Sequence, residues 1–432
     1  MIQTLRNAWK IADLRQKILY TLMILFVVRL GSVIPVPFLD PTTLASMISQ
    51  GGNLLGYLDI LTGGAFARAT LFALSISPYI TASIVIQLLT VAIPALEQLS
   101  KEGEDGKKKL QKYTRYTTVA LAVLESIAFY IMFRNTPGAL VYTSGFSGVL
   151  AGLTIIASFT GGAMLIVWLG ERIDQKGIGN GISLILFVGI VSRGPAAVLK
   201  LWTYLQFAMA GETSYYFYVP LVVVLFVVLI AFIVVMTNAE RRIPVQYAKR
   251  IVGRKMYGGQ STHIPIKVNM SGVLPVIFAS SFLAIPGTIK GFVDPTASTT
   301  LGKVLGWFDY NTGLYAALYF LLIIAFNYFY IAVQYNPIEM ANNLRKNSGT
   351  IPGIRPGKPT SDFISKVISK ITLIGALFLA AVAILPILVG AVAKMNIALG
   401  GTSIIIVVGV ALDTVRNLES QMMMRHYKGF LE

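Results

Sequence analysis

Very few side chains in this sequence could do chemistry. The 432 residues include no cysteine and only two histidines, His263 and His426. The absence of cysteine excludes disulfides, thiol catalysis and thiolate metal sites. A zinc site needs several ligands that converge, and the two histidines lie far apart in the chain. We therefore expect two loop histidines, no metal and no other cofactor.

Two further features could bind or transfer a charged group. The run GIGNG at 177–181 superficially resembles a phosphate loop, but it lacks the flanking strand and lysine and begins an apolar helix instead. Glu125 lies inside an apolar stretch, where an ionised side chain costs about 2.5–3.5 kcal/mol. It must face a polar partner or a water-filled space, and both alternatives stay open. None of these residues predicts an enzyme.

The elements that carry these residues are apolar helices. Hydrophobic residues make up 55% of the chain and charged residues 13%, against about 45–50% and about 25% in soluble domains. Stretches of about 20 apolar residues, enough to cross a bilayer, recur along the whole chain. We place them at 18–37, 75–96, 114–133, 149–170, 181–200, 217–238, 269–289, 313–335, 371–391 and 401–418. The sequence predicts an all-α integral membrane protein with about ten transmembrane helices.

The distribution of positive charge orients these spans. The net charge is +17, and most of the 36 lysines and arginines lie in alternate connections; Arg29, Arg68 and Arg193 are among the exceptions. By the positive-inside rule, both termini are cytoplasmic. The basic N-terminus precedes a run without a small-residue cleavage pattern, which indicates a retained first span. Two long cytoplasmic loops, near 239–268 and 336–370, either dock a partner or anchor the chain to anionic headgroups.

Short internal matches predict two related halves. The pattern P-x-I-x-A-S occurs at 78–83 and again at 275–280, and G-x-S-x-I occurs at 181–185 and at 401–405. With an odd number of spans in each half, the second half must enter from the opposite side, which gives two inverted five-helix halves, 1–210 and 211–432. The alternative explanation is that proline and small residues simply permit kinks and close packing at these points.

The stretch 53–77 is too interrupted to be a simple span. Asp59, Gly63, Gly64 and Arg68 break its apolar residues. Backbone at membrane depth must be satisfied inside protein or beside water, so we expect a re-entrant half-helix at about 58–72. An amphipathic loop on the outer surface is the alternative.

Long stretches of the chain resemble the SecY family of protein-conducting channels. They are LTGGAFARATLFALSISPYITASIVIQLLT (61–90), KEGEDGKKKLQKYTRYT (101–117), ERIDQKGIGNGIS (171–183), AKRIVGRKMYGGQSTHIPIKVNMSGVLPVIFASS (248–281), PGIRPGKPT (352–360) and GGTSIIIVV (400–408). The resemblance implies an hourglass channel that opens across the membrane and sideways toward lipid, between the second and seventh spans.

The resemblance also implies roles for individual residues. The re-entrant helix would be the family's plug. A collar of aliphatic side chains would exclude ions, because an ion that enters it loses its hydration water and finds no polar group in its place. Without the resemblance these aliphatics would be ordinary core or lipid-facing residues. The implied sets are the pore ring (Ile80, Ile84, Ile182, Leu186, Ile277, Ile406), the plug (Leu61, Gly63, Gly64, Phe66, Arg68), the lateral gate (Ser83, Gln87, Glu125, Asn269, Ser281) and the docking residues (Arg241, Arg242, Lys249, Arg250, Arg254, Lys255, Arg355).

The implied function is translocation of unfolded preproteins across the bacterial cytoplasmic membrane, with lateral release of membrane segments. The implied partners are the small subunits SecE and SecG, the SecA motor, signal sequences, lipid, and the ribosome, whose RNA would be bound through phosphates. For the lateral gate, we expect Glu125 to pair with Asn269 or Gln87 in the closed state. A secondary transporter of a small solute is the alternative, since inverted repeats and broken helices are expected there too. A passive scaffold or insertase is not separated from the channel by the sequence.

Overall fold

In the computed structural model, the protein is a bundle of helices. The structure describes residues 2–50, 59, 62–247, 250–252, 255–257, 261–292, 312–393, 395 and 401–428. A helix lies at every predicted span. The helices are α1 (Ile2–Lys10), α2 (Ala12–Gly31), α3 (Pro41–Gln50), α5 (Ser77–Ala92), α6 (Pro94–Lys101), α7 (Glu104–Arg134), α8 (Gly145–Lys176), α9 (Gly181–Val191), α10 (Gly194–Met209), α11 (Tyr215–Asn238), α12 (Leu274–Phe292), α14 (Gly313–Gln334), α15 (Pro337–Lys346), α16 (Lys358–Ala393) and α17 (Gly401–Lys428).

Most of these helices could cross a membrane. Seven spans in the described part of the chain are long and apolar enough, and the bent pair α5–α6 makes eight. Helix α2, at the predicted first span, carries Arg15, Lys17 and Arg29, and the apolar part of α12 is short, at Leu274–Leu283. The composition therefore predicted the membrane class and the helix positions, although α2 and α12 are not by themselves long and apolar enough to count among these spans.

Local sequence explains where the second span bends. Helices α5 and α6 meet at an angle of 103°. The residue before a proline avoids the helical region, and Ile93, which precedes Pro94, is extended with φ −112° and ψ 112°. Proline is well tolerated at the first position of a helix, so α6 starts there in a new direction.

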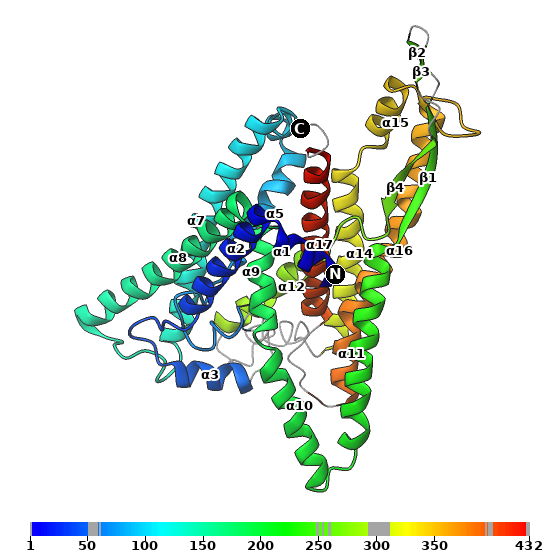
Figure 1. Cartoon of the computed structure of the whole chain (residues 1–432). Coiled ribbons are helices and arrows are strands. Elements are labelled where there is room, and N and C mark those ends of the chain that lie inside the picture. The colour runs from blue at the N-terminus through cyan, green and yellow to red at the C-terminus, as the bar shows by residue number, and fades with distance from the viewer. Residues whose placement is uncertain are drawn as a thin grey trace.

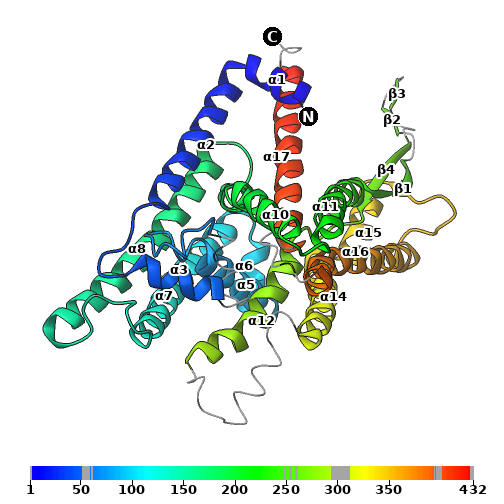
Figure 2. The same cartoon turned by 90° about the horizontal axis from the view of Figure 1, so that it is seen from below.

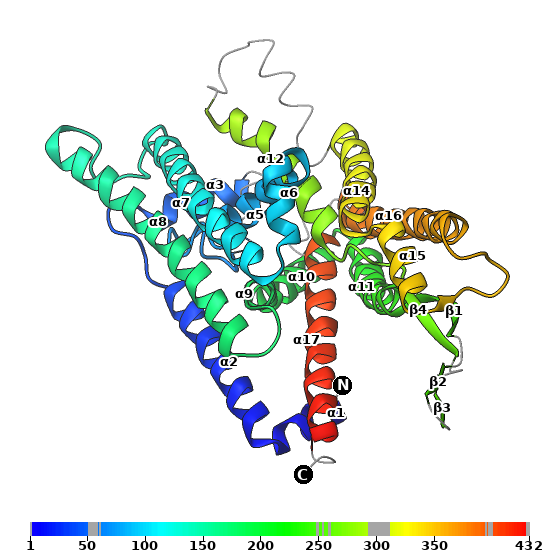
Figure 3. The ribbon, with the colours of Figure 1, turned by 90° about the horizontal axis from the view of Figure 1, so that it is seen from above.

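The apolar cores divide the bundle into three parts. One core fills the space among α7, α8 and the connection after α2, and a second joins α11, α12, α14, α16 and α17. A third, which we call the central cluster, lies between them and draws on α2, α5, α8, α9, α12 and α17. Figures 2 and 3 show α2, α7 and α8 on one side, α11, α14 and α16 on the other, and α17 between them.

The two long loops contain a small sheet, which the sequence analysis did not predict. Strand β1 (Glu240–Tyr247) pairs antiparallel with β4 (Ser261–Lys267) and with β5 (Gly349–Thr350), so that the strand order is β4-β1-β5. A second hairpin joins β2 (Arg250–Val252) and β3 (Lys255–Tyr257). Ile243, Val245 and Ile266 pack on the first turns of α16, and the sheet projects beyond the helices together with α15 (Figure 1).

The two ends of the chain lie together. Thr4 Oγ1 donates to Glu419 Oε1 at 3.1 Å, and Lys17 Nζ donates to Gln421 Oε1 at 3.4 Å. Ala8, Leu14 and Leu418 form a small core between α1, α2 and α17. This arrangement agrees with an even number of membrane crossings.

Candidate functional site

The central cluster brings together five of the six predicted ring residues. Leu186 and Ile406 are buried in it at 7% and 2% exposed, and Ile80, Ile182 and Ile277 pack against it half-buried. These side chains come from four helices: α5, α9, α12 and α17. Ile84 is half-buried on α5 and lies outside the cluster. Chain segments more than 300 residues apart thus meet in one aliphatic collar.

Helix geometry explains which side chains reach this collar. Ile182, Leu186 and Ile190 are spaced by four residues and therefore share one face of α9. Two hydrogen bonds fix the start of α9 and therefore the direction of this face. Asn180 Oδ1 accepts from the Ser183 amide at 3.0 Å, and Asp174 Oδ1 accepts from the Gly181 amide at 2.7 Å. The GIGNG run is therefore a tight turn that begins a membrane helix, as predicted.

Most of the predicted plug is not helical where the structure describes it. Asp59 is helical, but residues 62–69 and 71–76 form turns and Thr70 makes an isolated bridge with Pro35. Residues 51–58 and 60–61, which include Leu61, lie outside the described residues. The reason is a series of left-handed backbone positions, at Gly63 (φ 67°), Gly64 (φ 89°), Ala69 (φ 49°) and Ser75 (φ 49°). Each interrupts the regular helical ladder. The prediction of a half-helix at about 58–72 was therefore wrong over 62–72, although Asp59 is helical and the segment does turn back into the bundle.

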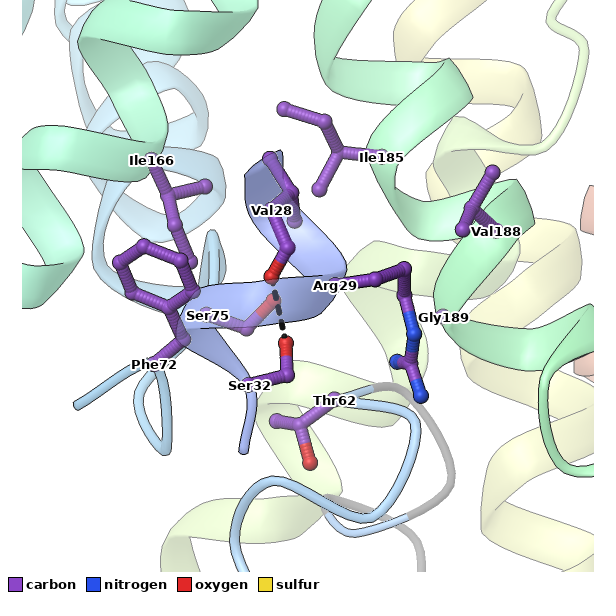
Figure 4. Close-up of a pocket in the computed structure, with 10 residues that line it drawn as sticks. All are labelled: Val28, Arg29, Ser32, Thr62, Phe72, Ser75, Ile166, Ile185, Val188 and Gly189. Carbon is purple, nitrogen blue, oxygen red and sulfur yellow. Dashed lines mark hydrogen bonds between the residues drawn. The ribbon is translucent and has the colours of Figure 1, made fainter. Parts of the chain in front are cut away.

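The plug segment packs directly under the collar. Phe72 and Ile76, 2% and 0% exposed, belong to the central cluster, and Phe66 packs in the neighbouring core. Figure 4 shows Thr62, Phe72 and Ser75 of this segment facing α2 and α9 across a small cavity. The cavity measures about 10 Å³, which is about the space for one water molecule. The segment therefore closes tightly on the wall.

Both plug glycines are required by their surroundings. A Cβ added at Gly63 would lie 2.6 Å from Arg29 Nη1 and 2.7 Å from the Gly189 carbonyl oxygen, and one at Gly64 would lie 3.0 Å from Arg193 Cζ. Both positions also have a positive φ, which glycine adopts without strain. The two arginines thus lie against the turn from α2 and from the α9–α10 junction.

Comparison with known proteins gives the family. The SecY family model matches residues 70–415. A protein translocase subunit SecY from Streptomyces scabiei is 42% identical, with all of both chains covered. The chain belongs to the SecY family. This is a family of channel subunits rather than of enzymes.

Two solved structures share the fold. One has a TM-score of 0.66 at 18% identity, and the match covers 94% of this chain and 92% of the other. That structure is described as showing that the plug domain of the SecY protein stabilises the closed state of the translocation channel and maintains a membrane seal. Sec61 in the canine ribosome-channel complex from the endoplasmic reticulum has a TM-score of 0.64 at 17% identity, with the same coverage. At these identities the likeness concerns the fold alone.

The residues assigned to the lateral gate of this SecY-family chain lie on three helices, α5, α7 and α12, except Asn269, which precedes α12. Helix α7 packs along α5 and contacts α12. Ser83, Glu125, Asn269 and Ser281 are half-buried and Gln87 is exposed. Within the described residues no hydrogen bond joins any two of these five, and Asn269 Oδ1 is buried without a partner. The structure thus represents a conformation in which Glu125 and Asn269 are not paired.

The assigned docking residues are only partly described. Arg241 and Arg242 lie on β1 and Arg355 follows β5, and all three are exposed. Arg242 Nε contacts Glu240 Oε1 at 2.7 Å. Arg250 and Lys255 are placed by their backbone in β2 and β3, whereas Lys249 and Arg254 lie outside the described residues. The described residues contain no group of three or more metal-ligating side chains.

One ion pair at the plug was missed by sequence reasoning. Arg193, at the start of α10, contacts Asp59. Both residues had been noticed, Asp59 as an interruption of an apolar stretch and Arg193 as an arginine on the side with few positive charges. No spacing rule links positions 134 residues apart, so only the three-dimensional structure reveals the pair.

Proposed function

We propose that this chain is the protein-conducting channel that moves unfolded preproteins across the bacterial cytoplasmic membrane. The observation that carries the proposal is the central cluster, in which aliphatic side chains from both ends of the sequence form one collar above the packed plug segment. An ion loses its hydration in such a collar without a polar group to replace it. A sliding polypeptide can be held loosely by the same side chains.

The proposal includes an orientation and an inverted repeat. Both termini and the sheet of the long loops would face the cytoplasm, in keeping with the positive charges in these segments. The plug would face the opposite side. Residues 1–210 and 211–432 would be the two inverted halves, with the collar where they meet. Apolar segments would leave between α5 and α12, beside α7.

The partners follow from exposed charge and from relatives. We propose that Arg241, Arg242, Lys249, Arg250, Arg254, Lys255 and Arg355 contact the SecA motor or ribosomal RNA phosphates, as the ribosome complex of the related Sec61 suggests. SecE and SecG would complete the translocase in the membrane. Glu125 would face a water-filled vestibule in the conformation described here and pair with Asn269 or Gln87 in a tighter one.

A solute transporter is the competing function, and the collar argues against it. A small-solute site needs several convergent polar groups, whereas the described side chains of the central cluster are aliphatic or aromatic, and its five collar residues are all aliphatic. The test is reconstitution of the purified complex with its motor in vesicles. We expect ATP-dependent protection of a preprotein from external protease. Uptake of small solutes without preprotein protection would contradict the proposal.

A further inference from the structure

The plug segment is organised around a single acidic side chain. Asp59 is 4% exposed, and its Oδ1 accepts from the Ala67 amide at 2.8 Å. Its carbonyl oxygen accepts from the Gly64 amide at 2.8 Å and from Thr62 Oγ1 at 3.1 Å. These bonds fold the Gly63–Gly64 turn around the carboxylate. Its other oxygen, Oδ2, is left to face the wall of the bundle.

Arg193 meets that oxygen from the α9–α10 junction. Its Nη2 contacts Asp59 Oδ2, and the exposed fractions of the two side chains are 27% and 6%. Arg193 Nε is buried without a hydrogen-bond partner. Part of the guanidinium is therefore held away from water, at a cost that the carboxylate must offset. The pair fastens the plug turn to the α9–α10 junction, directly after the helix that carries the collar residues Ile182 and Leu186.

A second arginine near the plug turn adds positive charge that the Asp59 carboxylate must balance. Arg29 approaches the turn from α2, with its Nη1 2.6 Å from the position of a Cβ on Gly63 (Figure 4). Arg29 and Arg193 interact electrostatically, and like charges repel. Arg68, in the same segment, is exposed. Without a negative charge at Asp59, the cations of α2 and of the α9–α10 junction would both face the plug turn with no opposing charge.

We propose that Asp59 and Arg193 form a latch that keeps the plug seated in the resting channel, and that Asp59 also screens Arg193 from Arg29. The inference rests on the proposed function. Opening requires the pair to separate, so the latch sets how readily the plug leaves. Both are positioning residues, since they act on the seal through the plug backbone and are not among the collar residues.

The geometry predicts unequal effects for the two partners. Asp59→Asn keeps an acceptor for the Ala67 amide but removes the charge and leaves two arginines unopposed. Arg193→Gln removes one cation and keeps the Asp59 carboxylate, with Arg29 still against the Gly63 turn. We therefore expect Asp59→Asn to raise the leak the most, by about ten- to a hundredfold, which corresponds to losing one charged hydrogen bond. Arg193→Gln should raise it less, and Arg193→Lys, which keeps the charge, should restore most of the closure.

The test measures chloride efflux and preprotein transport on the same vesicles, with the full translocase complex. Asp40→Asn is the matched control, because Asp40 is an acidic residue of a neighbouring connection whose carboxylate contacts only Thr42 and Thr43 in the described structure. It should leave the leak unchanged. Should Asp59→Asn fail to insert, Arg193→Gln and Arg193→Lys test the pair from the other side.

The outcomes separate the latch from the function on which it rests. Variants that transport preprotein and yet leak no more than the parent channel overturn the latch. An equal leak for Arg193→Lys and Arg193→Gln also overturns it, because charge would then not matter. A parent channel that holds chloride but transports no preprotein counts instead against the proposed function.

Discussion

Truncating one collar residue should open the resting channel to ions. Ile406 is 2% exposed in the central cluster, and Ile406→Ala removes three carbon groups at about 0.8 kcal/mol each, or about 2.4 kcal/mol. The cavity left behind places the loss within the range of about 2–5 kcal/mol measured for such truncations. If these contacts exist only when the collar is closed, about 2.4 kcal/mol raises the open population about fiftyfold.

The neighbouring residue provides a matched control. Ile405 is 1% exposed on the same helix, but it packs in the core of the second half and not in the central cluster. Ile405→Ala should therefore lower the free energy of unfolding by a similar amount without a leak. The assay is single-channel or vesicle ion conductance in the absence of preprotein, with thermal unfolding measured in parallel. Equal leaks from the two variants would refute the collar assignment, because the leak would then reflect general destabilisation.

Two further substitutions test the plug and the docking surface. Gly63→Ala should raise the leak because its methyl group meets the Gly189 carbonyl. Gly138→Ala should not, since Gly138 has a similar φ of 82° but its nearest neighbour is 3.6 Å away. Equal leaks from the two variants would mean that backbone strain alone is responsible. Arg242→Glu should weaken ribosome or motor binding by roughly three- to tenfold and flatten the salt dependence of that binding. The stability of the protein should change little, because the exposed pair of Arg242 with Glu240 contributes about 0–1 kcal/mol. Unchanged binding, or an equal loss with the exposed Arg134→Glu at the far end of α7, would contradict the docking role.

The membrane architecture could be predicted because it depends on local composition. Each predicted span coincides with a helix, since an apolar stretch of the required length has few other ways to satisfy its backbone in a bilayer. The collar positions came from resemblance, and the structure places five of the six in or against one apolar cluster. Their spacing on α9 and α17 is compatible with any buried helix face, so periodicity alone could not have selected them.

The remaining features depend on contacts between distant segments. Strand β1 pairs with β5 about a hundred residues later, and neither strand alone differs from an ordinary polar loop. The plug was expected to be a re-entrant half-helix because backbone at membrane depth must be hydrogen-bonded. The left-handed residues Ala69 and Ser75 carry no sequence signal comparable to glycine. The pair of Asp59 with Arg193 has the same origin. It becomes visible only when α9 and the plug segment are placed side by side.

The central claim is that a polypeptide passes through the collar. The chain has no cysteine, so single cysteines at Ile80, Ile277 and Ile406 can be crosslinked without background to one cysteine in a preprotein stalled during transport. We expect crosslinks at all three positions, and none at Ile405→Cys. A preprotein that is engaged and protected from protease but crosslinks to none of the three would contradict this account.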